Sequence, residues 1–218
     1  IRPITFFSGD SLCSIAVGET LEFFRVSDEG RLDPIGAILT PIDLINVVIP
    51  FDHYLLVAGG SNDVLAVDVA DPRAPVLVGD GFNALGGSGV SSAGNVRQLA
   101  VRGSILFVLF RGDARGTRPA LLTSWDVSTS VDNPTYLGAY FETGTEFLSM
   151  AIEASLLYIA AGNQGLRVLT VSDPMRIEQL NTITSVTSPE GLTIVGNYLV
   201  TANGFNGVSA LDLRQSGT

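Results

Sequence analysis

The sequence predicts an all-β fold that is built from five similar units of short antiparallel strands. Three observations lead to this prediction. Apolar runs of 5–8 residues, rich in Val, Ile, Leu and Phe, recur along the 218-residue chain. Gly, Asn, Asp and Pro bound these runs, which is typical of strands connected by turns. No 12-residue stretch shows the apolar spacing of an amphipathic helix.

The clearest repeat is an apolar run that ends in Gly or another small residue. Its five copies, each opening on Leu, cover residues 12–18, 55–60, 106–112, 157–162 and 199–204. The successive opening leucines are 43, 51, 51 and 42 positions apart. Self-similarity at such a period indicates a repeat architecture, so each copy predicts the same strand in a different unit.

Three further strands accompany each of these runs. A second apolar run follows it, at 21–27, 64–70, 121–128, 166–172 and 208–214. Turns such as 162–165 and 203–207 join the two runs, with Asn and Gly to supply the positive φ of tight hairpins. A preceding strand is predicted at 4–7, 44–49, 96–101, 146–152 and 191–195. A fourth strand, marked by Pro, is predicted at 33–39, 71–79, 132–140 and 173–183.

A four-stranded sheet with two apolar faces cannot stand alone in water. Radial repetition of such sheets covers both faces and protects the edges, so we predict a β-propeller, most simply with five blades of about four strands each. We expect one domain over residues 1–218. Its blades would cover approximately 1–40, 41–81, 82–141, 142–184 and 185–218.

The last unit lacks an evident fourth strand after Leu213. Residues 2–7 could supply it, which would place the two chain ends in one blade and is the arrangement that we favour. Alternatively the last blade has three strands, or the chain is part of a longer propeller.

The repeat resembles the LVIVD-repeat family of β-propellers. The clearest copy runs from Leu156 to Pro174 (LLYIAAGNQGLRVLTVSDP), and a second good copy spans Tyr54–Pro75. The resemblance implies a bacterial, usually extracytoplasmic, propeller with no shared enzymatic activity. It therefore favours a non-catalytic module that binds another protein or a larger assembly.

Two units are longer than the others, and their extra residues are candidates for a binding surface. The additions are residues 81–95, between two blades, and 111–119, between two strands of one blade. Both should lie on the same face of a propeller, and loops on a rigid scaffold often carry function. Arginines there could grip an anionic group bidentately. The candidate ligand- or partner-binding residues are Asn83, Asn95, Arg97, Arg111, Asp113, Arg115 and Arg118. The tripeptide Arg111–Asp113 matches the integrin-binding motif, although three residues carry little information.

Polar residues also precede the first strand of several units, where a propeller has its axial channel. They are Asp43, Asn95, Arg97, Glu146 and Glu190. The carboxylates could hold Ca²⁺ or act as the acid and base of a carbohydrate-active or metal-dependent enzyme. The simpler interpretation is a water-filled polar channel. No catalytic residue, metal ligand or obligatory cofactor is assigned.

A remote alternative is a GDSL-type serine hydrolase. Residues 7–12 (FSGDSL) and 60–63 (GSND) resemble two of its sequence blocks, which would make Ser11 the nucleophile and Gly60 and Asn62 oxyanion donors. The activating His near the C-terminus is missing, because the chain has only one His, at position 53. The repeat also places the two blocks at opposite ends of equivalent strands.

Composition excludes further classes. The net charge is −10, and the 12 basic residues are all Arg, so a basic surface for nucleic acid is not expected. No apolar run reaches the ~18 residues of a membrane-spanning helix. The single Cys, Cys13, excludes an intrachain disulfide and should be a small core residue. We expect His53 at the surface, in a turn. An extracytoplasmic location is expected from the family resemblance.

Overall fold

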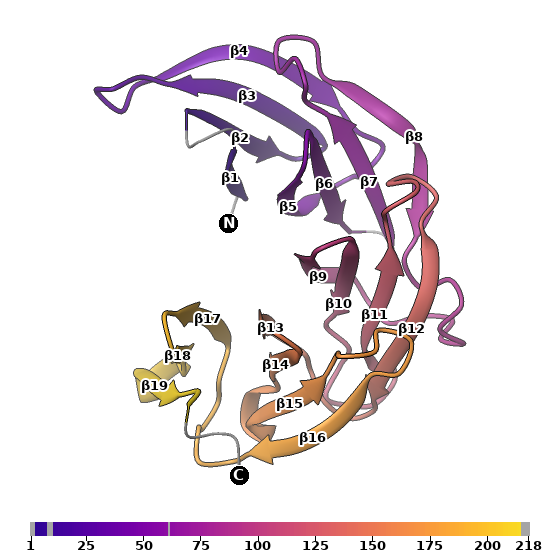
Figure 1. The fold of residues 1–218 in the computed structure, drawn as a ribbon, viewed down its shortest axis with the longest axis vertical. Helices are drawn as coiled ribbons and strands as arrows, with labels where there is room; N and C mark the ends of the chain where they lie inside the picture. Colours follow the sequence, from indigo (N-terminus) through magenta and orange to yellow (C-terminus); the bar gives the residue numbers. More distant parts are fainter. Residues whose placement is uncertain (1–2, 8–10, 61, 215–218) are drawn as a thin grey trace. The chain divides into compact units, whose positions relative to one another are not determined.

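Five antiparallel sheets make up the chain in the computed structural model, which describes residues 3–7, 11–60 and 62–214 (Figure 1). Four sheets have four strands and the last has three in the described residues, and neighbours in each sheet are consecutive in the sequence. The sheets, numbered 1 to 5 in chain order, are therefore simple up-and-down meanders. Residues Ile1–Ala84 with Val127–Thr135 form one compact unit, and Leu85–Asp126 with Tyr136–Thr218 form a second.

The first unit holds sheets 1 and 2. The strands of sheet 1 are β1 (Ile4–Phe7), β2 (Leu12–Val17), β3 (Thr20–Val26) and β4 (Leu32–Leu39). The strands of sheet 2 are β5 (Ile45–Phe51), β6 (Tyr54–Gly59), β7 (Asp63–Asp68) and β8 (Val76–Asn83). Buried side chains from both sheets, among them Leu21, Phe23, Leu55 and Val67, form one apolar core. The hydroxyl of Thr5 also donates to the carbonyl of Val48 at 2.7 Å, which links β1 to β5.

The second unit holds sheets 3, 4 and 5. The strands of sheet 3 are β9 (Val96–Arg102), β10 (Ile105–Phe110), β11 (Ala120–Asp126) and β12 (Thr135–Glu142), the last beginning at the unit boundary. The strands of sheet 4 are β13 (Ser149–Glu153), β14 (Leu156–Ala160), β15 (Leu166–Thr170) and β16 (Glu178–Ile183). The strands of sheet 5 are β17 (Gly191–Val195), β18 (Tyr198–Ala202) and β19 (Val208–Asp212).

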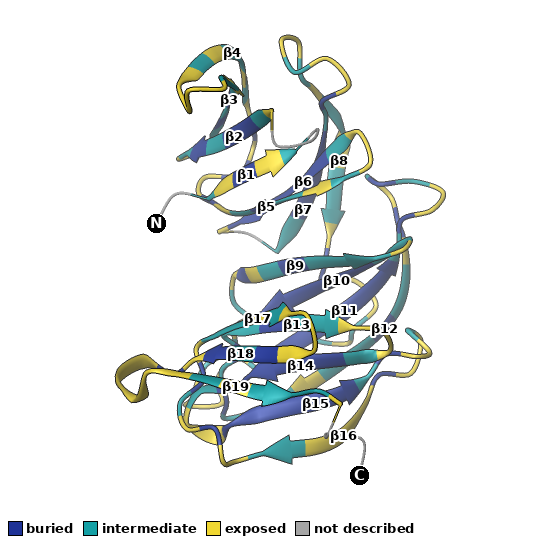
Figure 2. Ribbon diagram, turned by 60° about the vertical axis from the view of Figure 1, so that its left-hand side comes forward, coloured by how far each residue is buried: buried dark blue, intermediate teal, exposed yellow. Residues whose placement is uncertain are grey.

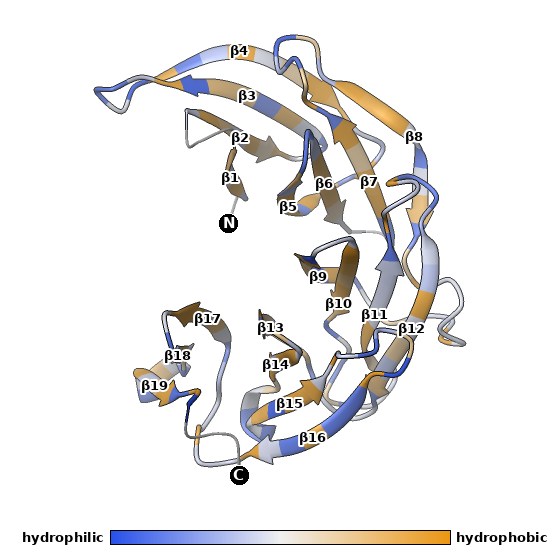
Figure 3. Ribbon diagram, viewed as in Figure 1, coloured by the Kyte–Doolittle hydropathy of each residue, from blue (hydrophilic) through white to orange (hydrophobic). Residues whose placement is uncertain are grey.

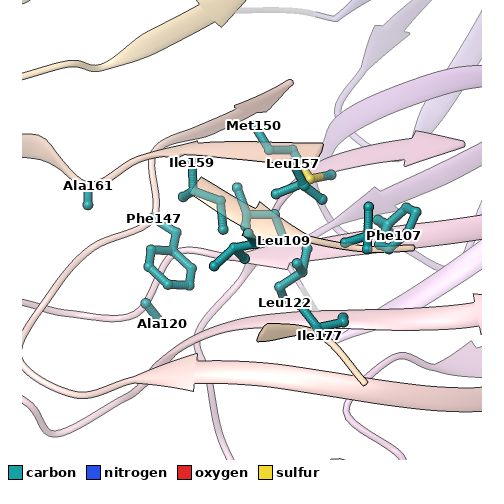
Figure 4. Close-up of a cluster of buried hydrophobic side chains, with 12 residues drawn as sticks. Phe107, Leu109, Ala120, Leu122, Phe147, Met150, Leu157, Ile159, Ala161 and Ile177 are labelled. Atoms are coloured by element: carbon teal, nitrogen blue, oxygen red, sulfur yellow. The ribbon is translucent and has the colours of Figure 1, made fainter. Parts of the chain in front are cut away.

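Apolar packing and side-chain hydrogen bonds join these three sheets. Phe107 and Leu109 of sheet 3 meet Leu157 and Ile159 of sheet 4 in the cluster of Figure 4. The side-chain amide of Gln98 on β9 forms two hydrogen bonds with the backbone of Met150 on β13. Its oxygen accepts from the Met150 N–H at 2.7 Å, and its nitrogen donates to the Met150 carbonyl at 2.9 Å. Both contacts join sheet 3 to sheet 4, and a second apolar cluster joins sheet 4 to sheet 5. The unit is therefore stabilised by repeated packing between neighbouring sheets.

Burial follows strand position within a sheet. The second and third strands of sheets 2, 3 and 4 are almost wholly buried, as in β10 and β11, whereas fourth strands such as β4 and β16 have few or no buried residues (Figure 2). Hydropathy matches this gradient, since β16 (EQLNTI) is mostly hydrophilic (Figure 3). A middle strand contacts apolar side chains on both faces, which explains the continuous apolar runs that marked the repeat.

A buried ion pair lies between sheets 3 and 4. Arg167 is 7% exposed and binds Glu142 through two hydrogen bonds of 2.8 and 2.9 Å. The hydroxyl of Tyr140 donates a hydrogen bond to the same carboxylate. Burial raises the pKa of Glu142, but the hydrogen bonds from Arg167 and Tyr140 and the charge of Arg167 outweigh it, so this pKa lies below its ordinary value. Burial and the Glu142 carboxylate raise the pKa of Tyr140.

The structure confirms every predicted strand, with shifted boundaries. β8 begins at Val76 and β16 at Glu178, later than the Pro-marked runs suggested, because the residues around each Asp-Pro form turns. In one of them the carboxylate of Asp71 accepts from the N–H of Arg73 at 3.0 Å, and Asp173 forms the equivalent turn. β8 also continues to Asn83, so the first three residues of the predicted 81–95 insertion are strand.

The favoured arrangement of the chain ends is wrong. β1 pairs with β2 in sheet 1, from Ile4 opposite Ile15 to Phe7 opposite Leu12. In the described part of the chain, β19 pairs only with β18, so sheet 5 has three strands. The two ends therefore contribute to different sheets, because β1 has its complementary partner next to it in the sequence.

Candidate functional site

The second unit brings the two insertions together. The connection between β8 and β9 contributes residues 85–95 to this unit, and the β10–β11 connection contributes 111–119. The N–H of Gly112 donates to the carbonyl of Ala93 at 3.2 Å, so the two segments are in contact. Ala93 itself is fully buried, which anchors the first segment to the sheets. We call residues 85–95 and 111–119 the insertion loops.

The second insertion loop is held by its own acidic residue. The carboxylate of Asp113 accepts from the N–H of Thr117 at 3.0 Å and from the Thr117 hydroxyl, and the N–H of Asp113 donates to the carbonyl of Arg118 at 2.9 Å. The Thr117 hydroxyl is the main cause of the lowered pKa of Asp113. This carboxylate is therefore engaged by hydrogen bonds within its own loop. Arg115 and Arg118 remain exposed beside it.

A cavity of about 300 Å³ lies at the base of the insertion loops. Its lining residues are Arg97, Arg111, Leu148 and Glu190. The Nε of Arg97 donates to the carbonyl of Leu148 at 2.9 Å, and the Nε of Arg111 lies 2.9 Å from Oε1 of Glu146. Each contact orients a guanidinium group through its Nε and does not involve its terminal nitrogens.

The repeat explains why these residues converge. Arg97 is the second residue of β9, Leu148 directly precedes β13 and Glu190 directly precedes β17. Arg111 directly follows β10. First strands begin, and second strands end, at the same side of an up-and-down meander, so neighbouring sheets bring these four positions to one place. The sequence repeat could therefore predict that these residues lie near one another, but not the distances between their side chains.

The predicted site residues divide between the two units. Arg97, Arg111 and Glu190 line the cavity, Glu146 binds Arg111 beside it, and Asn95 is exposed in the adjoining loop. Asn83 lies opposite Asp63 in the β7–β8 pairing, and Asp43 is an exposed residue before β5, so both belong to the first unit. Sequence reasoning missed Leu148, whose apolar side chain gave no signal of a site.

The surroundings of the carboxylates do not favour a cation. In residues 3–7, 11–60 and 62–214, no three His, Cys, Asp or Glu side chains gather closely enough to hold a metal ion. Glu146 is bound to Arg111, and Glu190 shares its cavity with two arginines. Nearby positive charge opposes the binding of a hard cation such as Ca²⁺, so the arrangement gives no support to the calcium hypothesis.

His53 lies in the β5–β6 turn of the first unit, beside two cavities of about 400 and 260 Å³. Its Nδ1 is 2.9 Å from Oδ2 of Asp52, and its ring lies 3.9 Å from the ring of Tyr54. Asp52 has a φ of +55°, at a turn position that glycine occupies in sheets 3 and 5. The His53 side chain is 42% exposed, as expected for a surface turn. The sequence analysis indicated neither cavity, and Phe7, Pro50 and Pro72 also line the larger one.

The two hydrolase-like blocks do not form one site. Ser11 directly precedes β2 and Gly60 directly follows β6, so they lie at opposite ends of equivalent second strands. Residues 8–10 and 61 of these blocks lie outside the described residues. Cys13, also on β2, is fully buried as predicted. The helical content of the described residues is limited to two three-residue turns, 162–164 and 204–206, and none of it is long and apolar enough to cross a membrane.

Comparisons with known proteins support the predicted repeat. Residues 51–80, which include β6 and β7, match the family model of the LVIVD repeat. Comparison with curated protein sequences finds no significant match.

Solved β-propellers share the fold of the chain. A protein from Lactobacillus plantarum has a TM-score of 0.73 at 14% identity, over 95% of this chain and 65% of that one. A putative 6-phosphogluconolactonase from Bacteroides fragilis has a TM-score of 0.71 at 13% identity, with coverages of 94% and 64%. The WD40 β-propeller domain of Doa1 has a TM-score of 0.67 at 10% identity, with coverages of 97% and 64%. The chain thus spans somewhat less than two thirds of each structure, and these likenesses show an all-β propeller fold.

Proposed function

We propose that this chain with an LVIVD repeat and a β-propeller fold is a non-catalytic binding module, whose partner is another protein or a larger assembly. The observation that carries the proposal is the contact between the insertion loops, directly beside the cavity that holds Arg97 and Arg111. Two lengthened repeats thereby contribute to one surface on an otherwise regular scaffold. Recognition surfaces are commonly built from loops on a rigid framework.

The composition of the insertion loops supports a protein partner. Residues 85–95 are rich in Gly and Ser, which offer adaptable backbone and hydroxyl hydrogen bonds. Arg115 and Arg118 are exposed, and neither forms an ion pair with another described residue. Arginine is enriched at protein interfaces, where its guanidinium binds carboxylates through two hydrogen bonds. The loops therefore suit a partner that presents acidic side chains.

Charge reversal in the second insertion loop tests this proposal. Arg115→Glu/Arg118→Glu and the wild type are immobilised, and proteins captured from an extract of the source organism are quantified by mass spectrometry. The control is Arg31→Glu/Arg176→Glu, which makes the same charge change at side chains that are 74% and 78% exposed in other loops. We expect the loop variant to lose the captured partner by at least about tenfold and the control to keep it. Equal capture by both variants would remove the proposal.

An extracytoplasmic location is part of the same proposal, and it is supported only by the resemblance to LVIVD-repeat propellers. Fractionation of cells of the source organism, followed by immunoblotting, tests it. The chain should be found with the periplasmic or secreted proteins, and its recovery with the cytoplasmic proteins would contradict this part of the proposal.

A further inference from the structure

The cavity lined by Arg97, Arg111 and Glu190 carries charges of both signs. Two guanidinium groups and the Glu190 carboxylate line it, together with the apolar side chain of Leu148. Glu146 binds Arg111 from one side at 2.9 Å and neutralises it in part. No described cation forms an ion pair with Glu190, and Arg97 has none with a described carboxylate. The site therefore offers one positive group, one negative group and an apolar wall.

The sheets hold the residues that line this cavity in position before any ligand arrives. The Nε–Leu148 bond of 2.9 Å fixes the plane of the Arg97 guanidinium, and the backbone N–H of Glu190 donates to the carbonyl of Ala202 at 2.8 Å. Leu148 is held in the same way, through its N–H and the carbonyl of Ala160 at 2.9 Å. Positions fixed by the sheets reduce the ordering cost of binding.

We propose that this cavity binds a small zwitterion, namely an α-amino acid with an apolar side chain. The ligand carboxylate binds the terminal nitrogens of Arg97, its ammonium group binds the carboxylate of Glu190, and its side chain lies against Leu148. A volume of about 300 Å³ is at the lower end of the range of small-molecule sites, roughly 300–1,000 Å³. It suits a ligand of this size.

Charge complementarity favours a zwitterion over a simple ion. A cation would meet two arginines, and an anion would meet Glu190 in a chain whose net charge is −10. A ligand with both charges satisfies both groups and is not repelled at long range by the net charge. This inference is separate from the proposed partner binding, because it concerns the isolated chain and a different set of contacts.

Isothermal titration calorimetry with three related probes tests the inference. L-leucine carries both charges, N-acetyl-L-leucine lacks the ammonium group as a peptide C-terminus does, and L-leucinamide lacks the carboxylate as a peptide N-terminus does. We expect one saturable site for L-leucine and binding at least about tenfold weaker for either analogue, because each loses one charge-assisted hydrogen-bonding group.

Two variants assign the charges to residues. Glu190→Gln should weaken L-leucine by about tenfold and leave N-acetyl-L-leucine unchanged, whereas Arg97→Gln should weaken L-leucine and leave L-leucinamide unchanged. Glu178→Gln, an exposed change on β16, is the matched control and should bind as the wild type does. Circular dichroism shows whether each variant is folded.

Three outcomes would overturn the inference without pointing to another ligand. They are no saturable binding of L-leucine to the folded wild type, equal affinity for all three probes, and unchanged L-leucine affinity in both cavity variants. Tighter binding of N-acetyl-L-leucine than of L-leucine would also overturn it, in favour of a site for peptide C-termini.

Discussion

Removal of the buried guanidinium of Arg167 should destabilise the second unit strongly. Arg167 donates two hydrogen bonds to Glu142 and one each to the backbone carbonyl and side-chain oxygen of Gln164, at 2.7–2.9 Å. Arg167→Met keeps most of the apolar stem but leaves the Glu142 carboxylate without its charged partner. Breaking a fully buried ion pair costs roughly 3–5 kcal/mol. The Glu142 side chain is 20% exposed, so water replaces part of the loss and we expect about 3 kcal/mol.

Urea unfolding followed by circular dichroism measures this free energy, and a double-mutant cycle with Glu142→Gln isolates the pair. The double variant should lose less than the sum of the two single variants, with a coupling energy of roughly 1–3 kcal/mol. The reasoning would be refuted if Arg167→Met unfolded within about 0.5 kcal/mol of the wild type, or if the two changes were additive.

The same pair predicts a pH dependence. The pKa of Glu142 is lower in the folded chain than its ordinary value of 4.5. Folding therefore gains stability from this carboxylate above its unfolded-state pKa, and loses that gain as the pH falls through the lower, folded-state pKa. Between neutral and acidic pH, the wild type should lose more stability than Arg167→Met, and the two should converge in acid. A constant difference across this range would contradict the assignment.

Two further predictions concern a strained turn and the single thiol. Ala154 has a φ of +50°, at a turn position that Gly103 and Gly196 occupy in other sheets. Ala154→Gly should therefore relieve left-handed backbone strain and stabilise the chain by about 0.5–1 kcal/mol. A lower melting temperature of the variant in calorimetry would contradict this. Cys13 is fully buried, and burial raises the pKa of its thiol. Ellman's reagent should therefore label Cys13 quickly only in denaturant, and rapid labelling of the native chain would show that β2 is not packed as described.

The strands were predictable because their signals are local. Apolar runs bounded by Gly and Asn mark strands that are buried on both faces, and every such run became a strand. The exact starts of the fourth strands were not predictable in the same way, since the turns at Asp71 and Asp173 depend on side-chain hydrogen bonds to the backbone.

The site was predictable only in part. The repeat indicated that Arg97 and Glu190 would lie near equivalent strand ends, because equivalent positions of the sequence repeats lie at the same side of their sheets. It could not indicate that Arg111 binds Glu146, or that Leu148 supplies an apolar wall, since these contacts depend on side-chain directions across two sheets. The placement of Asp43 in the first unit likewise comes from the packing of the chain and not from its repeat.

The central claim is that a scaffold of buried strands carries its binding surface on the insertion loops. Hydrogen exchange tests this claim most directly, when it is measured for the free chain and for its complex with the captured partner. In the free chain, β10, β11 and β14 should exchange slowest and residues 85–95 and 111–119 much faster. In the complex, new protection should appear in those two loops and not at the β5–β6 turn. Protection confined to other segments, with the insertion loops unchanged, would contradict the account.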